Sequence, residues 1–358
     1  MRKKTYFEFM RILACGLVIF NHHAGYWLFA TTSGLKQFFY MCLTMFTRVN
    51  VPIFFMISGA LLLNKTESVS CVLKRFFRIV FTLLLFDFIM LLVNKLTYSA
   101  KGQAYEVSFS KLFWGFLSNS IDGTSPYWYL YAYLGFLLML PFLRKAVIGF
   151  SKSEFNILLY VHFIVWSAIP ILNIILGMFG IPNIQICWDF DVPFAFDKAF
   201  FYPLIGYYLE YNVDVEKMKN KNYVWLVIIG ITGITISVIC TYYEASQIGS
   251  YTQNYVQLFD YLSAIVVFLI IKSLVVKMSS NGQNGKLSTI ISYIGSLTFG
   301  IYLFEPVLRR ILFEKYELFA EPLLPTIIVT FGWIIICMLC GGILTYSLKK
   351  IPVVRKLL

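Results

Sequence analysis

Apolar runs separated by short polar segments make up most of the chain, and they have the lengths of membrane-spanning helices. A helix needs about 20 residues to cross the ~30 Å hydrocarbon core of a bilayer. The second run is long and the sixth is short, so we expect one to be broken and the other tilted. The pattern predicts an all-α integral membrane protein, a bundle of ten transmembrane helices, with apolar runs at residues 8–29, 38–63, 76–95, 126–143, 154–177, 198–211, 222–241, 255–276, 288–312 and 323–348.

Basic residues indicate on which side of the membrane each connecting segment lies. With the N-terminus inside, twenty Lys and Arg residues fall on inner segments and eight on outer segments, with Arg11 and Arg48 set aside as intramembrane. Cytoplasmic segments have the excess of Lys and Arg in membrane proteins, so both termini are expected in the cytoplasm. No segment between the runs is long enough for a soluble domain. Residues 1–358 are therefore expected to form a single membrane domain.

Composition agrees with this fold class and limits the functions. Of the 358 residues, 59% are hydrophobic and 13% are charged, which is typical of multi-pass membrane proteins. The net charge of +12 comes from basic residues between the apolar runs, so it indicates topology and not nucleic-acid binding. No metal site is expected, since Cys337 and Cys340 have no second ligand pair. The sequence also lacks phosphate-binding-loop and zinc-protease motifs, so ATP-driven transport and metal hydrolysis have no support.

The first run contains ionisable residues where a bilayer disfavours them. Arg11 and His22 are eleven positions apart, which is roughly 16 Å along a helix and close to three turns. Their side chains therefore point to nearly the same face. Ionisable residues at such depth normally face a protein interior or a wet cavity. The simpler interpretation is an anchor at Arg11 and a structural polar contact at His22.

Three ionisable residues from three runs are expected at one depth, in the outer half of the membrane. His22 and Glu305 each lie about two-thirds of the way outward along their runs, and Arg48 lies about a third of the way in from the outer side. A neutral imidazole oriented by a carboxylate can deprotonate a hydroxyl. The alternative is a polar network that only holds the helices together.

Two further groups of residues could bind a substrate. Arg75 and Arg78 lie three positions apart at a cytoplasmic helix start, beside Lys74, and their guanidinium groups suit a phosphate-bearing ligand. The alternative is the basic anchor that is common at such helix ends. An aromatic group, which suits either a substrate platform or an interfacial belt, begins the fourth run: Trp128, Tyr129 and Tyr133.

The order and spacing of these motifs together resemble the family-three membrane acyltransferases, ten-span enzymes that use acyl-CoA to O-acetylate cell-envelope polysaccharides and other acceptors. The resemblance covers nearly the whole chain. No single motif is specific, but the set is. The motifs are Arg11-x10-His22, Arg48 through Ser58-Gly59, Arg75-x-x-Arg78, Trp128-Tyr129 and Ile301-Tyr302-Leu303.

The resemblance implies a role for each matching position. His22 would be the catalytic base and Arg11 its paired arginine, while Arg75 and Arg78 would bind CoA at the cytoplasmic side. The chain departs from the family at Glu305, where relatives often have His after the Tyr-Leu run. A carboxylate there could still orient the imidazole, and with Arg48 it would set the charge of His22 and steady an oxyanion.

We therefore expect a multi-pass enzyme of the bacterial plasma membrane that moves an acetyl or other small acyl group from acetyl-CoA to a hydroxyl of a cell-envelope glycan or related acceptor. Its partners would be the lipid bilayer, the acyl-CoA and the acceptor. Neither a nucleic acid nor a metal is expected, and the chain could form a homodimer. The alternative is a transporter or flippase for a small molecule or glycan precursor. A third interpretation is a scaffold for envelope assembly. The intramembrane charged residues argue against it, because a scaffold has no use for them.

Overall fold

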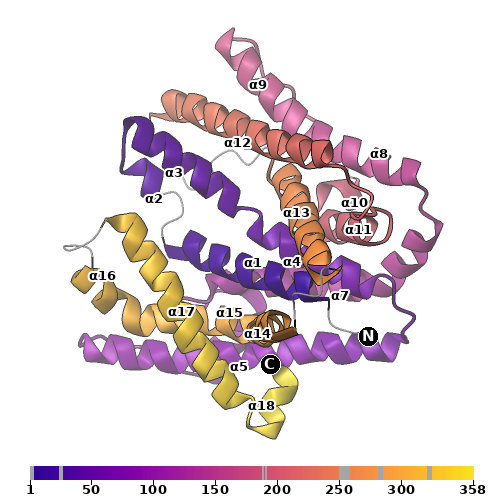
Figure 1. Cartoon of the computed structure of the whole chain (residues 1–358). Coiled ribbons are helices and arrows are strands. Elements are labelled where there is room, and N and C mark those ends of the chain that lie inside the picture. Colours follow the sequence, from indigo (N-terminus) through magenta and orange to yellow (C-terminus); the bar gives the residue numbers. More distant parts are fainter. Residues whose placement is uncertain are drawn as a thin grey trace. The chain divides into compact units, whose positions relative to one another are not determined.

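The computed structural model describes residues 4–23, 27–187, 189, 192–249, 259–280, 285–320 and 325–358. Within these ranges the regular structure is helical and contains no strand, in agreement with the predicted all-α class (Figure 1). The chain forms two compact units, and each is built from two separate stretches of sequence. Unit 1 contains residues 1–65 and 142–288, and unit 2 contains residues 66–141 and 289–358. The prediction of a single membrane domain stays a prediction.

Unit 1 is a group of helices in which α4 packs on α11 and on α1, and α13 packs on α1 and on α12. The π-helical turn Ile164–Ala168 joins α8 to α9. The helices of this unit are α1 (Thr5–His23), α2 (Trp27–Ala30), α3 (Gly34–Thr47), α4 (Asn50–Leu62), α8 (Lys152–Phe163), α9 (Ile169–Met178), α10 (Pro193–Phe196), α11 (Lys198–Tyr211), α12 (Asn220–Ile248) and α13 (Asp260–Ser280).

Unit 2 contains the longest helix, α5, which packs on α6, α15 and α18, while α15 packs on α17. Its elements are α5 (Val69–Ala100), α6 (Phe109–Ser118), the 3-10 turn η1 (Ser125–Tyr127), α15 (Thr298–Leu308), the π-helical turn η3 (Arg309–Phe313), α16 (Glu314–Ala320), α17 (Thr326–Leu348) and α18 (Pro352–Leu357). Two helices cross the boundary between the units along the chain: α7 (Trp128–Gly149) and α14 (Gly285–Gly295).

Helices correspond to all ten predicted runs, although parts of the first, eighth and tenth runs lie outside the described residues. Seven helices of the described ranges are long and apolar enough to cross a membrane, and the pair Gly285–Gly295 and Thr298–Phe319, bent by 46°, makes an eighth if it forms one span. The two predicted runs that are not among them correspond to α1, which contains charged residues, and to α11, which has 14 residues. The count of ten spans and the cytoplasmic termini stay predictions.

The contact between α4 and α11 brings two backbones together without side chains between them. A Cβ added to Gly59 would overlap the backbone of Pro203, and a Cβ added to Gly206 would overlap the backbone of Met56. The sequence Ser58-Gly59-Ala60 places small residues at this point of α4. Small residues allow the close helix approach that stabilises membrane bundles. The contact therefore fixes the centre of unit 1.

A short helix between α5 and η1 begins and ends with typical capping geometry. The Ser108 hydroxyl accepts a hydrogen bond from the Lys111 backbone N–H at 3.2 Å, and Asn119 ends the helix in the left-handed conformation with φ of 49°. Asn tolerates this conformation better than most residues do. The aromatic side chains Phe109, Phe113 and Trp114 of α6 are exposed. Exposed aromatic groups of this kind suit a helix that lies at a membrane interface.

Candidate functional site

The predicted catalytic pair lies on the single helix α1 of unit 1. Arg11 donates a hydrogen bond from Nη1 to Glu8 Oε1 at 2.7 Å, one turn earlier on the same helix. The Glu8 side chain is 5% exposed and that of Arg11 is 30% exposed, so the ion pair is largely shielded. His22 is half-buried in the last turn of α1. A continuous helix thus holds the arginine and the imidazole at their predicted spacing.

Arg48 follows α3 and lines a small cavity of unit 1 together with Asp260, Ser237 and Ser263. The cavity has a volume of about 10 Å³, which is the size needed for one water molecule. The Asp260 carboxylate lies close enough to interact electrostatically with the Arg48 guanidinium. Asp260 also forms an ion pair with Lys198 at 3.1 Å. In unit 1, therefore, the carboxylate beside Arg48 comes from the start of α13.

A second ionic cluster of unit 1 was not predicted from the sequence. The Glu210 carboxylate is ion-paired with Lys4, accepts a hydrogen bond from the Tyr6 hydroxyl at 2.6 Å and lies 3.3 Å from Lys272 Nζ. Lys272 Nζ also donates to the backbone carbonyls at the end of α11, those of Leu209 at 2.8 Å and Glu210 at 2.9 Å. The cluster joins α1, α11 and α13, and every charge in it has a partner.

In unit 2, two of the predicted phosphate-binding residues line one open groove. Lys74 and Arg78 lie one turn apart on α5, and the groove they line has a volume of about 680 Å³, within the usual range for small-molecule sites. Exposed apolar side chains of the same helix, Leu73, Phe77 and Phe81, form its wall. Ser70 of α5 and two residues of α18, Lys356 and Leu357, complete the lining.

The third predicted phosphate ligand, Arg75, does not line this groove. Both of its terminal nitrogens donate to the Glu67 carboxylate, and the Nη2–Oε1 distance is 2.7 Å. This bidentate pair ties the start of α5 to the loop before it and neutralises the arginine. Lys74 and Arg78 therefore share the lining of the groove, whereas Arg75 is paired with Glu67 and is not part of that lining.

The predicted aromatic residues form part of a cluster that joins η1 and α7 to α15. The rings of Tyr129 and Tyr133 stack with centroids 6.1 Å apart, and Tyr302 packs edge-on against Tyr129 at 6.2 Å. The Tyr127 hydroxyl donates to the Leu303 carbonyl at 2.7 Å. The Trp128 ring does not pack against the described rings of this group and is 51% exposed. Tyr129 and Tyr133 thus share a surface, and Trp128 is separate.

Two buried carboxylates lie within the helices of unit 2. Glu305 is fully buried on α15, one turn after Tyr302. Asp87 lies in the middle of α5, is 1% exposed, and neither of its carboxylate oxygens has a hydrogen-bond partner among the described residues. It lies close enough to Tyr127 and Tyr131 for an electrostatic interaction. An ionisable residue at mid-span is a functional candidate by default, and this rule alone would have found Asp87 in the sequence.

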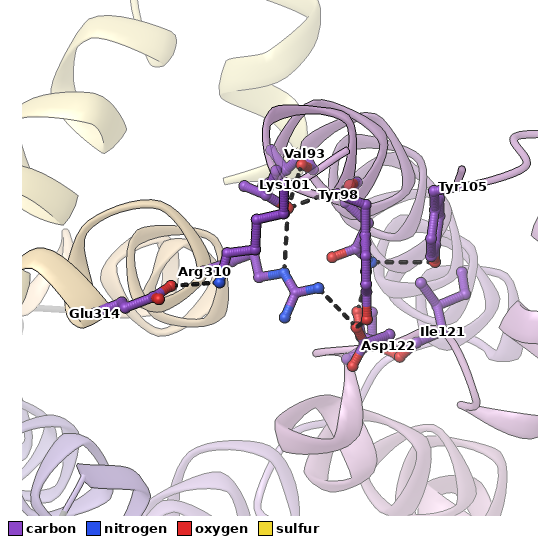
Figure 2. A network of polar contacts seen from close by, with 11 residues as sticks. Val93, Tyr98, Lys101, Tyr105, Ile121, Asp122, Arg310 and Glu314 are labelled. Carbon is purple, nitrogen blue, oxygen red and sulfur yellow. Dashed lines mark hydrogen bonds and ion pairs between the residues drawn. The ribbon is translucent and has the colours of Figure 1, made fainter. Parts of the chain in front are cut away.

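The far end of α5 is held by a polar network that Figure 2 shows. Arg310 Nη2 and the Tyr98 hydroxyl both donate to Asp122 Oδ2 at 2.9 Å, and Lys101 forms an ion pair with Glu314 at 2.6 Å. The Tyr98 and Tyr105 rings stack with centroids 5.0 Å apart. The network ties α5, the loop before η1 and η3 together, so its charges serve the fold.

The predicted cluster of His22, Arg48 and Glu305 combines residues from both units. His22 and Arg48 belong to unit 1 and Glu305 belongs to unit 2. Their convergence at one depth stays a prediction, as do the roles of Arg11 and His22.

Comparison with known proteins tests the predicted resemblance to the family-three membrane acyltransferases. A family model described as an acyltransferase domain, acyltransferase 3, matches residues 4–344. No curated protein and no solved structure matches the chain. The match covers nearly the whole chain and includes both halves of each unit, so the predicted resemblance is confirmed. The chain belongs to the acyltransferase 3 family.

Proposed function

We propose that this protein transfers an acetyl or other small acyl group from cytoplasmic acyl-CoA to a hydroxyl of a cell-envelope glycan or related acceptor at the outer face of a bacterial plasma membrane. The family match indicates acyltransferase activity and gives no support to a transporter or flippase. The groove of unit 2 is the observation that extends this activity to a CoA donor, because it combines small-molecule dimensions with cations on its lining.

The donor's phosphates would bind in the groove. Among the described residues, Lys74 and Arg78 have no ion-pair partner, so their charge is available to a ligand. Hydrogen bonds between ionised donors and phosphate oxygens are short and about twice as strong as neutral ones. Arg75 lies beside them at the start of α5 and keeps its predicted role in donor binding, although its two terminal nitrogens already bind Glu67.

The chemical step needs a base for the acceptor hydroxyl, and His22 is the proposed base. As the hydroxyl oxygen attacks the thioester carbonyl, its proton passes to the imidazole. A C–O bond forms, the C–S bond breaks, and the CoA thiolate leaves and takes up a proton. A positioned imidazole is the most common general base for a proton transfer of this kind.

The other predicted residues would support this step. Arg11, which Glu8 holds on α1, would guide the thioester towards His22, and Arg48 and Glu305 would set the charge of the imidazole and steady the developing oxyanion. The aromatic residues at the start of α7 would bind the acceptor: Trp128, Tyr129 and Tyr133.

The test is acetyl-CoA binding and turnover by purified protein in nanodiscs, with free CoA detected by a thiol reagent. Hydrolysis without an added acceptor suffices, because water can replace the hydroxyl. We expect Lys74→Ala and Arg78→Ala each to weaken binding about tenfold, and His22→Ala to lower turnover by a factor of about 100 or more with binding retained.

Two matched variants serve as controls. Lys145→Ala removes an exposed basic residue outside the groove, and His23→Ala removes the neighbouring imidazole, which points about 100° away on the same helix. Both should behave like the wild type. Absence of acetyl-CoA binding by the wild type at millimolar concentration would contradict the CoA donor, and full turnover by His22→Ala would contradict the base.

A further inference from the structure

We infer that α18 completes the donor site, and that Lys356 is a third cationic ligand for the phosphates of the acyl-CoA. This inference rests on the proposed function, since it extends the same groove. From the sequence alone, Lys356 is one of several basic residues at the C-terminal end that indicate only the side of the membrane. The groove lining instead joins it to Lys74 and Arg78, which lie far from it in the sequence.

The position of α18 follows from its contact with α5. Arg78 donates a hydrogen bond from Nε to the Leu357 carbonyl at 3.1 Å, and the Thr82 hydroxyl lies 3.4 Å from the same oxygen. Thr82 is fully buried and also donates to the Arg78 carbonyl at 2.7 Å. The arginine thus uses Nε to hold α18 in place, while its two terminal nitrogens remain for a ligand. Lys356 is the residue next to this anchor.

The three cations of the groove are not neutralised by ion pairs with carboxylates of the described residues. Within the described ranges neither Lys74, Arg78 nor Lys356 forms an ion pair, whereas the neighbouring Arg75 is neutralised by Glu67. Three like charges around one groove repel each other, and an anion between them relieves this repulsion. The arrangement therefore favours a ligand with several negative charges.

A phosphate could belong to the donor or to an anionic lipid, and the number of charges favours the donor. A phosphodiester lipid such as phosphatidylglycerol brings one negative charge, whereas CoA has a diphosphate and a 3′-phosphate. The apolar wall of Leu73, Phe77 and Phe81 suits the adenine ring beside the phosphates. The groove is thus matched to a polyphosphorylated ligand with an apolar part.

The test compares Lys356→Ala with Arg355→Ala, which removes the same charge from the same helix but at an exposed residue outside the groove. Acetyl-CoA binding is measured in nanodiscs of phosphatidylcholine alone and of phosphatidylcholine with phosphatidylglycerol. We expect Lys356→Ala to weaken binding about tenfold in both, Lys356→Arg to restore most of the affinity, and Arg355→Ala to match the wild type. Unfolding midpoints of the variants should equal that of the wild type.

Two results would overturn the inference, and they differ from a failure of the proposed function. If the wild type binds acetyl-CoA and Lys356→Ala binds it equally tightly, α18 has no part in the donor site, although the CoA donor stands. If Lys356→Ala instead lowers only the retention of phosphatidylglycerol, the third cation serves a lipid. Absence of acetyl-CoA binding by the wild type would remove the donor proposal itself.

Discussion

Basic residues of the two units have the same chemistry but very different surroundings. In unit 1, Lys4 and Lys272 surround the buried Glu210 carboxylate, and Lys272 also caps the carbonyls at the end of α11. In unit 2, the cations of the groove have no carboxylate partner among the described residues. The paired lysines around Glu210 thus stabilise the fold, whereas the unpaired cations that line the groove are available to a ligand. Substitutions should therefore affect stability in the first unit and binding in the second.

The largest loss of stability is expected when the Glu210 carboxylate is removed. Glu210→Ala leaves Lys272 buried without a counter-charge, and breaking a buried ion pair in this way costs about 3–5 kcal/mol. The measurement is thermal unfolding of the purified protein in detergent. The double variant Glu210→Gln/Lys272→Met, which removes both charges, should recover part of the loss. An unchanged midpoint for Glu210→Ala would show that this cluster contributes nothing to the fold.

A smaller change in stability, and in the opposite direction, is expected when the Asp87 carboxylate is replaced by an amide. Its carboxylate has no hydrogen-bond partner in the described part of unit 2, so the isosteric change Asp87→Asn should leave the free energy of unfolding unchanged or raise it by about 1 kcal/mol. If Asp87 takes part in the reaction, turnover should nevertheless fall about tenfold or more. The unfolding midpoint and CoA release are measured on the same preparation. Lower stability with unchanged turnover would indicate a packing role.

The smallest change in stability is expected in the groove. Lys74→Gln removes an exposed charge with no ionic partner in the described residues, so the free energy of unfolding should change by less than about 0.5 kcal/mol. Thermal unfolding beside the Glu210 variants measures this difference directly. A loss comparable to that of Glu210→Ala would break the distinction between the two groups of basic residues.

The sequence predicted those parts of the molecule that depend on local patterns. Each apolar run corresponds to a helix, and Lys74, Arg75 and Arg78 lie near the start of a helix, as the sequence predicted. Hydrophobic runs and helical periodicity are local properties, so they can be read without knowing how the helices pack.

Contacts between distant residues could not be predicted in the same way. Arg75 and Arg78 were expected to act together, but Glu67 binds Arg75 from a loop whose conformation no periodic pattern reveals. The partners of Glu210 come from the start of α1 and from α13, and basic residues there indicated only topology. Lys356 reaches the groove because α18 packs on α5. Each of these contacts follows from tertiary packing.

The close contact of α4 and α11 has a consequence for the synthesis of the protein. With 14 residues, α11 extends roughly 21 Å, which is shorter than the hydrocarbon core, so a position within the membrane would require the support of a protein surface. The surface of α4 around Gly59 would provide this support, but the ribosome completes α4 well before α11 emerges. We therefore expect the two helices to leave the insertion machinery as a pair, with α4 retained until its partner arrives.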